Sequence, residues 1–436
     1  MTIEMAVPAA DAGPAGLPRV LPPVPVRGLR AHDGRYGPVR LQGEALVSEV
    51  ERSGLTGRGG GAFPAGRKLR SVAQLAGRRG SVLVANGMES EPASVKDASL
   101  LARAPHLVLD GIGLAAAAVS AREAYLCVSR PDLADELSAA VAERAGRDPL
   151  PVTVTVVPDR YVASEESALV HYLNGGAAVP LFVPPRPFER GVRGRPTLVA
   201  NVETLANVAL ISRHGAGWFR SLGVSDAPGS ALVTVGGAVR QPGVYEIALG
   251  TPLRDVLALA GAALAVPAGP AGPAGPAVQA VLAGGYFGSW LAGGRALDVP
   301  ASPPALRAAG AGFGAGILLV LPPGGCGLAE TARVVRYLAG QSAGQCGPCL
   351  HGLPEIADGL DEIAFGGGHG TRRAIRALRD LVGLVEGRGA CHLPDGVARL
   401  AASTLRVFAE DVRRHERGPC AGSRIRPVFW VPGESS

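Results

Sequence analysis

The feature that most constrains the fold is the spacing of three short apolar runs, at residues 81–85, 124–128 and 152–157. Runs of this length, ending at polar or turn residues, are typical of buried strands. Helical patterns separate and flank them, at 46–53, from about 66 onward, at 105–121, 132–145 and 165–173. Strands that alternate with helices predict an α/β layer with a mostly parallel sheet over residues 46–225.

The flanking segments have different patterns. Residues 1–45 are rich in Pro, Ala and Gly and predict an extended lead-in. Residues 226–324 predict a small β/α domain, with a hairpin formed by strands at 231–237 and 244–247, a helix at 253–259, and an exposed Gly-Pro-Ala loop too short for a collagen helix. Residues 325–415 predict a four-helix bundle, with helices at 329–340, 353–363, 371–386 and 397–414, before a tail at 416–436.

Composition excludes two classes of protein. The net charge is +6, but the basic residues are scattered and aromatics make up only 4%, so nucleic-acid binding is not expected. The longest apolar stretches, at 112–119 and 317–321, are too short to cross a bilayer, and the N-terminal residues show no signal-peptide pattern. The sequence predicts a cytoplasmic protein. Lys68 and Lys96 are its only lysines, which hints that a compact ammonium is needed there.

The cysteines gather in the C-terminal part of the chain. Cys346 and Cys349 form a CxxC turn, and Cys391 follows between two expected helices. Thiolates three residues apart can ligate one iron–sulfur cluster, with a distant cysteine as a further ligand. The same pattern fits a redox pair, half of a zinc site, or inert buried thiols.

Other polar groups lie where ligands bind in α/β folds. Gly57, Gly59, Gly60 and Gly61 precede the helix that carries Lys68, which suits a phosphate at a helix N-terminus, although such turns are common in a chain with 62 glycines. A second set follows expected strands or begins helices, where carboxylates also complement the helix dipole: Asn86, Glu89, Glu165, Glu166, Asn201 and Thr204.

Five motifs follow one another along the chain: GRGGGAFPAGRK (57–68), NGMESEPASVKD (86–97), YVASEESAL (161–169), ANVETL (200–205), and CGPC (346–349) with Cys391. In this order they resemble the motifs of the flavoprotein F subunit of NADH-quinone oxidoreductase. That family includes the flavoprotein subunits of soluble NAD-linked hydrogenases and formate dehydrogenases. The resemblance covers about residues 40–415, and residues 235–259 resemble the family's soluble-ligand-binding β-grasp domain.

The resemblance implies a Rossmann-like FMN-binding domain, a β-grasp domain and a four-helix bundle with an iron–sulfur site. It also implies roles for individual residues. The FMN phosphate and flavin would be held by Gly57, Arg58, Gly59, Gly60, Lys68, Asn86, Glu165, Asn201 and Thr204. Phe63 would stack on the NADH adenine, and Glu89 and Glu166 would lie near the flavin and nicotinamide. Cys346, Cys349 and Cys391 would hold a 4Fe–4S cluster.

The activity implied is that of an NADH dehydrogenase-like oxidoreductase subunit. Electrons would pass from NADH through FMN to the cluster, because flavin accepts two electrons and releases them singly. The expected partners are other redox subunits, such as a thioredoxin-like 2Fe–2S protein, with peripheral association to a membrane complex.

Several positions depart from the family pattern. The first cluster cysteine is replaced by Ala343. The fourth ligand is then an outside group, such as His351, His392, Cys326, water or a group of a partner, or else the cluster is labile or absent. Among the motif residues that would surround the nucleotide, five positions differ from the family pattern: Leu69, Ser71, Met88, Ser164 and Ala200. Two alternatives follow from these changes: a flavin carrier that uses a donor other than NADH, or a redox-complex scaffold with a degenerate cofactor site.

Overall fold

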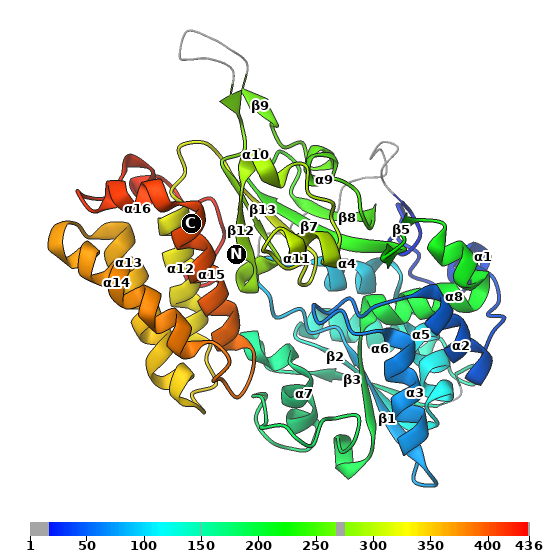
Figure 1. Ribbon diagram of the computed structural model, residues 1–436. Coiled ribbons are helices and arrows are strands. Elements are labelled where there is room, and N and C mark those ends of the chain that lie inside the picture. Colours follow the sequence, from blue (N-terminus) through cyan, green and yellow to red (C-terminus); the bar gives the residue numbers. More distant parts are fainter. Residues whose placement is uncertain (1–16, 149, 267–274, 435–436) are drawn as a thin grey trace.

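The computed structural model describes residues 17–148, 150–266 and 275–434. Figure 1 shows an α/β layer, a second sheet beside it, and a group of helices formed by the C-terminal part of the chain. The Gly-Pro-Ala loop lies almost wholly outside the described residues. It is flanked by a two-stranded antiparallel ribbon of β9 (Ala265–Val266) and β10 (Gly275–Pro276).

The first sheet is parallel, as the alternation of strands and helices predicts. Its four strands lie in the order β3-β2-β1-β4, and all pairings are parallel. The strand β4 was not expected from the sequence. The strands are β1 (Ser81–Asn86), β2 (Ala121–Val128), β3 (Val152–Val156) and β4 (Thr197–Asn201).

Helices cover both faces of this sheet. Along β1, Leu83 and Ala85 face the larger core cluster, while Val82 and Val84 face the smaller cluster on the other side, as the period of a strand requires. Side chains of α2, α3, α5, α6 and α8 line the larger cluster, and those of α7 line the smaller. The helices are α2 (Gly43–Ser53), α3 (Ala65–Ala76), α4 (Lys96–Arg103), α5 (Pro105–Ala118), α6 (Pro131–Ala142), α7 (Glu166–Leu173) and α8 (Val202–Arg220).

The lead-in is not wholly extended, which corrects the expectation for residues 1–45. It contains α1 (Leu29–Tyr36), and α2 begins at Gly43. The helix is fixed by a buried polar contact, because His32 Nε2 lies 2.8 Å from Asp110 Oδ2 on α5. Arg213 of α8 also binds this carboxylate. Such tertiary contacts are invisible in the local composition.

The second sheet has five strands in the order β12-β11-β13-β7-β8. The expected hairpin is present as the antiparallel pair β7–β8, and β13 pairs parallel with β7. The helices α9 (Leu253–Leu259), α10 (Gly293–Ala296) and α11 (Pro303–Ala308) accompany it. The strands are β7 (Ser230–Gly237), β8 (Gly243–Ala248), β11 (Ala280–Ala283), β12 (Ser289–Ala292) and β13 (Ile317–Leu321).

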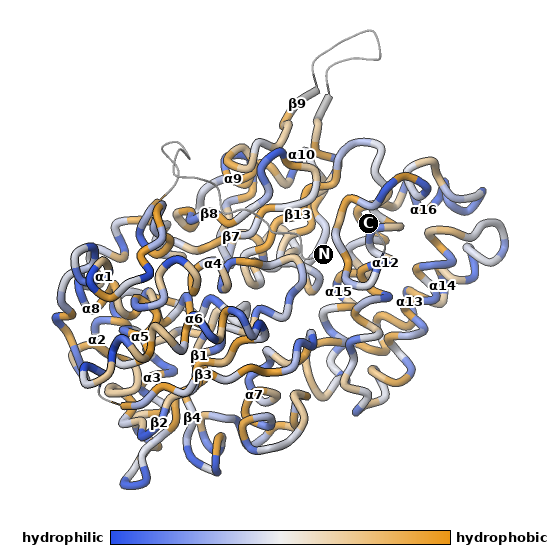
Figure 2. The backbone as a smooth tube through the Cα atoms, turned by 180° about the vertical axis from the view of Figure 1, so that it is seen from behind, coloured by the Kyte–Doolittle hydropathy of each residue, from blue (hydrophilic) through white to orange (hydrophobic). Residues whose placement is uncertain are grey.

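The C-terminal helices form a bundle, with one difference from the sequence prediction. The expected helix at 397–414 is two helices that separate at Phe408, whose ring lies 5.0 Å from that of Trp290. In Figure 2, α13 and α14 alternate between orange and blue, as amphipathic helices do. The helices are α12 (Gly327–Gly340), α13 (Leu353–Phe365), α14 (Gly368–Val385), α15 (Leu393–Val407) and α16 (Ala409–His415).

The tail after α16 packs on the bundle core. Phe429 is 3% exposed and stacks on Trp290, with ring centroids 5.6 Å apart. The carboxylate of Glu330 on α12 accepts hydrogen bonds from Val428 N and Phe429 N, at 2.7 and 3.2 Å. The tail therefore belongs to the same structural unit as the bundle.

Within the described residues, no single helix is both long and apolar enough to cross a membrane. The pair α4 and α5 passes that test together, but the two helices are bent by 97°.

Candidate functional site

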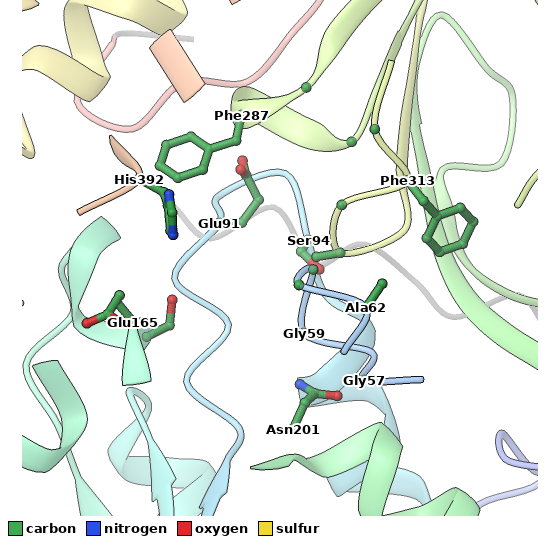
Figure 3. A pocket seen from close by; sticks show the side chains of 18 of the residues that line it. Gly57, Gly59, Ala62, Glu91, Ser94, Glu165, Asn201, Phe287, Phe313 and His392 are labelled. Atoms are coloured by element: carbon green, nitrogen blue, oxygen red, sulfur yellow. The ribbon is translucent and has the colours of Figure 1, made fainter. Parts of the chain in front are cut away.

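A cavity of about 740 Å³ lies where the three parts of the fold meet. Its lining comes from the glycine-rich turn and strand ends of the α/β layer, from residues 310–315 beside the second sheet, and from residues 391–393 at the start of α15. Figure 3 shows Glu91 near Phe287, with Glu165 and His392 to one side and the glycine-rich turn and Asn201 to the other. The volume is in the range of small-molecule sites.

The glycine-rich turn is closed at its base and packed tightly at its tip. Gly57 N donates to Phe63 O at 2.8 Å, and the turn leads directly into α3. A methyl group at Gly59 would lie 3.3 Å from Asn201 Cβ. Gly60 has φ +105° and lies against the backbone of Gly314. The turn therefore presents bare backbone to the cavity at a helix N-terminus, which suits a phosphate.

Arg58 and Thr204 hold this turn in place. Arg58 N donates to Thr204 Oγ1 at 2.9 Å. The buried guanidinium of Arg58 donates to Ser230 O at 2.9 Å and to Thr56 Oγ1 at 3.0 Å, which anchors the turn to β7. Thr204 does not line the cavity. Both residues were predicted to bind the cofactor, and the contacts they make here are with the protein.

Lys96 is the centre of a buried charge network that the sequence did not assign to the site. It is 1% exposed, and its Nζ lies 2.6 Å from Asp97 Oδ1 and 2.9 Å from Glu203 Oε2. Burial alone would lower the pKa of Lys96, but the two carboxylates raise it by more than burial lowers it. The net shift is upward, so the ammonium stays charged. Glu203 Oε1 accepts Leu232 N of β7 at 2.9 Å, which joins the network to the second sheet.

The two asparagines stand at the carboxyl ends of adjacent strands. Asn86 ends β1 and donates to Ser164 O at 2.8 Å. Asn201 ends β4, donates to Asp97 Oδ2 at 2.7 Å, and accepts Glu203 N at 3.0 Å as the N-cap of α8. Both line the cavity, at the sheet edge where open α/β sheets bind ligands.

Glu89 lines the cavity and also closes the start of α4. Its carboxylate accepts Asp97 N at 2.9 Å, Ala98 N at 2.8 Å and Ser94 Oγ at 2.7 Å. These bonds hold its backbone at φ +43°. Burial, with the nearby charge of Asp97, raises the pKa of Glu89 to about 7.

Glu91 belongs to the second of the five motifs, but it was not predicted as a site residue. Its Oε2 accepts Tyr161 Oη at 2.6 Å and Tyr286 N at 3.1 Å. Its Oε1 is buried and has no hydrogen-bond partner among the described residues. Burial raises the pKa of Glu91 to about 7. An unsatisfied buried oxygen on a cavity wall indicates a ligand that supplies the missing donor.

Glu91 should contribute a loss of stability to the ligand-free protein as the pH rises. Since the folded-state pKa is about 7 and the ordinary value is 4.5, the folded protein keeps this proton longer than the unfolded chain. The stability that the protonated Glu91 contributes to the folded state is fully present below pH 4.5 and is lost as the pH rises through 7. Glu91→Gln cannot titrate, so it should gain about 2–3 kcal/mol relative to the parent between pH 5 and pH 8.

Urea unfolding at the two pH values measures this difference. The exposed glutamate Glu136 of α6 offers a control, because Glu136→Gln should leave the pH dependence of the parent unchanged. Equal pH dependence of parent and Glu91→Gln would contradict the burial of an ionisable carboxyl at this position.

Of the neighbouring residues Glu165 and Glu166, only the first lines the cavity. Glu165 lines the cavity, caps α7 by accepting Ser167 N at 2.8 Å and Ala168 N at 3.1 Å, and has its pKa raised by burial. Glu166 does not line it, because its Oε2 pairs with Lys68 Nζ at 2.8 Å. Both partners of this pair are about one-third exposed. Phe63 is 51% exposed and also lies outside the cavity lining.

The three predicted cluster ligands lie in two segments of the chain, one between α12 and α13 and the other just before α15. Cys346 and Cys349 stand at the turn that leads into α13, and Cys349 is 3% exposed. Although burial raises the pKa of Cys346, hydrogen bonds involving Ala390 and Cys349 bring it below its ordinary value. Burial raises the pKa of Cys349 to about 11. Cys391 lines the cavity itself.

Some departures from the family pattern have a structural reason. Met88 is fully buried in the smaller core cluster of the α/β layer, so its side chain fills core space. Leu69 is likewise buried, on the inner face of α3. Ala343 packs against the bundle core close to the cysteines in sequence, and it offers no ligand atom. Three thiols are thus present for a cluster.

The residues present fit the expected groups. A bare-backbone cradle at a helix start and an orphaned carboxylate oxygen suit a phosphorylated ligand with hydrogen-bond donors. The thiols of Cys346, Cys349 and Cys391 are the soft ligands that iron–sulfur clusters take. Of the predicted residues, those that line the cavity are Gly57, Arg58, Gly59, Gly60, Asn86, Glu89, Glu165, Asn201 and Cys391.

Comparison with known families gives three matches along the chain. Residues 50–210 match the Nuo51 FMN-binding domain, residues 232–268 the SLBB domain, and residues 329–415 the NADH-ubiquinone oxidoreductase-F iron-sulfur binding region. These segments correspond to the first sheet with its helices, the β7–β8 hairpin with α9, and the bundle.

Individual relatives match over most of the chain. The F subunit of NADH-quinone oxidoreductase from Streptomyces coelicolor is 31% identical over 428 residues, 92% of this chain and 90% of the relative. The corresponding F subunit from Mycobacterium tuberculosis H37Rv is 32% identical over 400 residues, 86% of this chain and 85% of the relative.

A crystal structure of an NAD⁺-reducing [NiFe]-hydrogenase in the H₂-reduced state is also similar, with a TM-score of 0.76 and 29% identity. The match covers 87% of this chain, which spans 63% of the hydrogenase chain.

Proposed function

Because the chain belongs to the family of NADH-quinone oxidoreductase F subunits, we propose that it oxidises NADH at FMN and delivers the electrons to a 4Fe–4S cluster. The observation that carries this proposal is the position of Cys391. This cluster ligand lies on the wall of the same cavity whose floor is the glycine-rich turn. The two redox groups would therefore be neighbours, as direct electron transfer requires.

The chain's own residues bind and orient the cofactor. The backbone of residues 57–60 and the N-terminus of α3 would hold the FMN phosphate, with Lys68 in the first turn of that helix. Asn86 and Asn201 offer polar atoms at the strand ends, and Glu165 offers its carboxylate at the start of α7. FMN, when bound, supplies two-electron acceptance and one-electron release.

Two carboxyls handle protons in this site. The pKa of Glu89 and that of Glu91 both lie at about 7, so each group can hold or release a proton at neutral pH. Among the residues that the structure describes, Glu91 Oε1 is the acceptor of the pair that has no donor, because the oxygens of Glu89 are occupied by the α4 cap. We assign Glu91 to ligand positioning beside the predicted catalytic residue Glu89.

Lys68 and Glu166 need a change of partner to act as predicted. Their ion pair is partly exposed, and such pairs contribute only about 0–1 kcal/mol. Lys68 could therefore exchange Glu166 for a ligand phosphate at the α3 N-terminus at small cost, which would free the Glu166 carboxylate.

The same proposal extends to the cellular compartment and to the partner subunit. The six cysteines are all unpaired, which suits a reducing compartment such as the cytoplasm. A cluster near the surface of a bundle suits hand-over to a second redox subunit, such as a thioredoxin-like 2Fe–2S protein, in a complex that associates peripherally with a membrane.

The visible spectrum of the anaerobically purified chain tests the function. We expect flavin bands that bleach on addition of NADH, above the broad absorbance of a thiolate-bound cluster. Flavin bands that persist with NADH but bleach with a reduced ferredoxin-type donor would contradict NADH as the donor. A chain that stays colourless after reconstitution with FMN, iron and sulfide would contradict the redox function and favour a scaffold.

A further inference from the structure

A second group of sulfur and imidazole ligands lies in the bundle, away from the cysteines already described. Cys326, His415 and Cys420 each offer one ligand atom, and these three atoms all lie within 4.8 Å of one another. Cys326 is 4% exposed and His415 is fully buried, while Cys420 is half-buried. We propose that these three side chains bind a zinc ion.

The distances suit a tetrahedral ion with little movement. Cys326 Sγ lies 3.8 Å from His415 Nε2. With zinc bonds of about 2.0–2.3 Å, two ligand atoms of a tetrahedral site lie roughly 3.5–3.8 Å apart. Two thiolates and one imidazole are the donor set that zinc prefers, and the fourth position falls to a solvent molecule.

The histidine is held in the tautomer that a metal needs. His415 Nδ1 lies 3.0 Å from Ile363 O on α13, so the ring donates its Nδ1 proton to this carbonyl. The Nε2 lone pair then faces the two sulfurs, an arrangement common among metal-ligating histidines. The backbone N–H of Cys420 donates weakly to Nε2 at 3.3 Å, and this bond would give way to the ion.

The site is separate from the iron–sulfur site. Cys326 caps the N-terminus of α12, where its Sγ accepts Ala329 N at 3.4 Å, whereas Cys346 follows the C-terminus of the same helix. A helix of 14 residues is about 20 Å long. The same separation holds along α13, since Ile363 is near its end and Cys349 precedes its start.

The ligands come from three segments that an ion would tie together. Cys326 begins α12, His415 ends α16, and Cys420 lies in the tail. The tail carries Phe429, which covers Trp290 in the bundle core. Zinc at this point would fix the tail on the bundle, and its binding free energy would add to the stability of this part of the fold.

Metal analysis of the full-length protein tests the proposal with reciprocal variants. We expect about one zinc per chain beside the iron. Cys420→Ser, which changes a half-buried tail residue, should reduce zinc to less than a tenth while iron and flavin are kept. Cys391→Ser should instead lose the iron while zinc and flavin are kept. His415→Gln should lose zinc as Cys420→Ser does, which guards against one variant simply misfolding.

Cobalt gives a second readout that does not depend on activity. Co²⁺ added to the zinc-depleted parent should give the intense visible bands of a tetrahedral thiolate site, and Cys420→Ser should lose them. The proposal is overturned if the parent, grown with added zinc, contains none and gives no such bands. It is equally overturned if anaerobic protein shows a Cys326–Cys420 disulfide by mass spectrometry, or if zinc persists in both variants.

Discussion

Gly59→Val is expected to abolish FMN binding while leaving a folded chain. Even a methyl group at this position lies 3.3 Å from Asn201 Cβ, and the branched side chain of valine would fill the space above the bare backbone of the turn. The cradle would then be blocked at the point where the phosphate must approach. We expect the affinity for FMN to fall at least ~100-fold, or about 2.7 kcal/mol, as measured by quenching of flavin fluorescence.

The same turn supplies the control. A methyl group added at Gly61 would have no atom of the described residues within 4 Å, and the φ of Gly61 is not in the left-handed region. Gly61→Ala should therefore bind FMN within a factor of about 3 of the parent, a difference of roughly 0.7 kcal/mol. Equal loss in both variants would mean that the turn merely tolerates no side chains, and equal retention would mean that the phosphate lies elsewhere.

Cys391→Ser should remove the cluster and keep the flavin. The hydroxyl of serine is a hard ligand with a much higher pKa than a thiol, and only three family cysteines are present to begin with. We expect iron to fall below ~10% of the parent value. NADH should still bleach the flavin, but reduction of a one-electron protein acceptor should drop at least ~100-fold, because the route out of the cavity is lost.

Cys127 provides the matched control for loss of a cysteine. It is fully buried in β2, and burial raises the pKa of its thiol to about 12, so it is inert. Cys127→Ala should keep both iron and flavin. If Cys391→Ser retains the iron content of this control, Cys391 is not a cluster ligand.

The sequence predicted those parts of the fold whose pattern is local. The apolar runs that became β1, β2 and β3 and the turn of the β7–β8 hairpin carry their own signals. The strand β4 and the helices α4 and α8 were not predicted, because each has one end inside a motif that was interpreted as a ligand-binding segment. The break at Phe408 has no local breaker. It follows from the packing of this ring against Trp290 and the backbone of Gly327, a contact between distant segments.

In the site, too, features with a local pattern were predicted, and features that depend on contacts between distant segments were not. The glycine-rich turn and the strand-end asparagines were predicted, because their position after a strand or before a helix can be read along the chain. The wall formed by residues 310–315 carries no motif, and only the tertiary fold brings it to the turn. The unsatisfied oxygen of Glu91 could be found only by tracing hydrogen bonds. The role of Lys96 was hinted at by its being one of two lysines.

The contact between Gly60 and Gly314 has a consequence for how the protein is assembled. The two glycines belong to loops beside different sheets, and their backbones meet at the wall of the cavity. Because this contact between the two sheets completes the wall of the cavity, the cofactor site exists only while the sheets stay together. Bound cofactor should therefore resist their separation, so that unfolding of the second sheet and loss of the cofactor occur together.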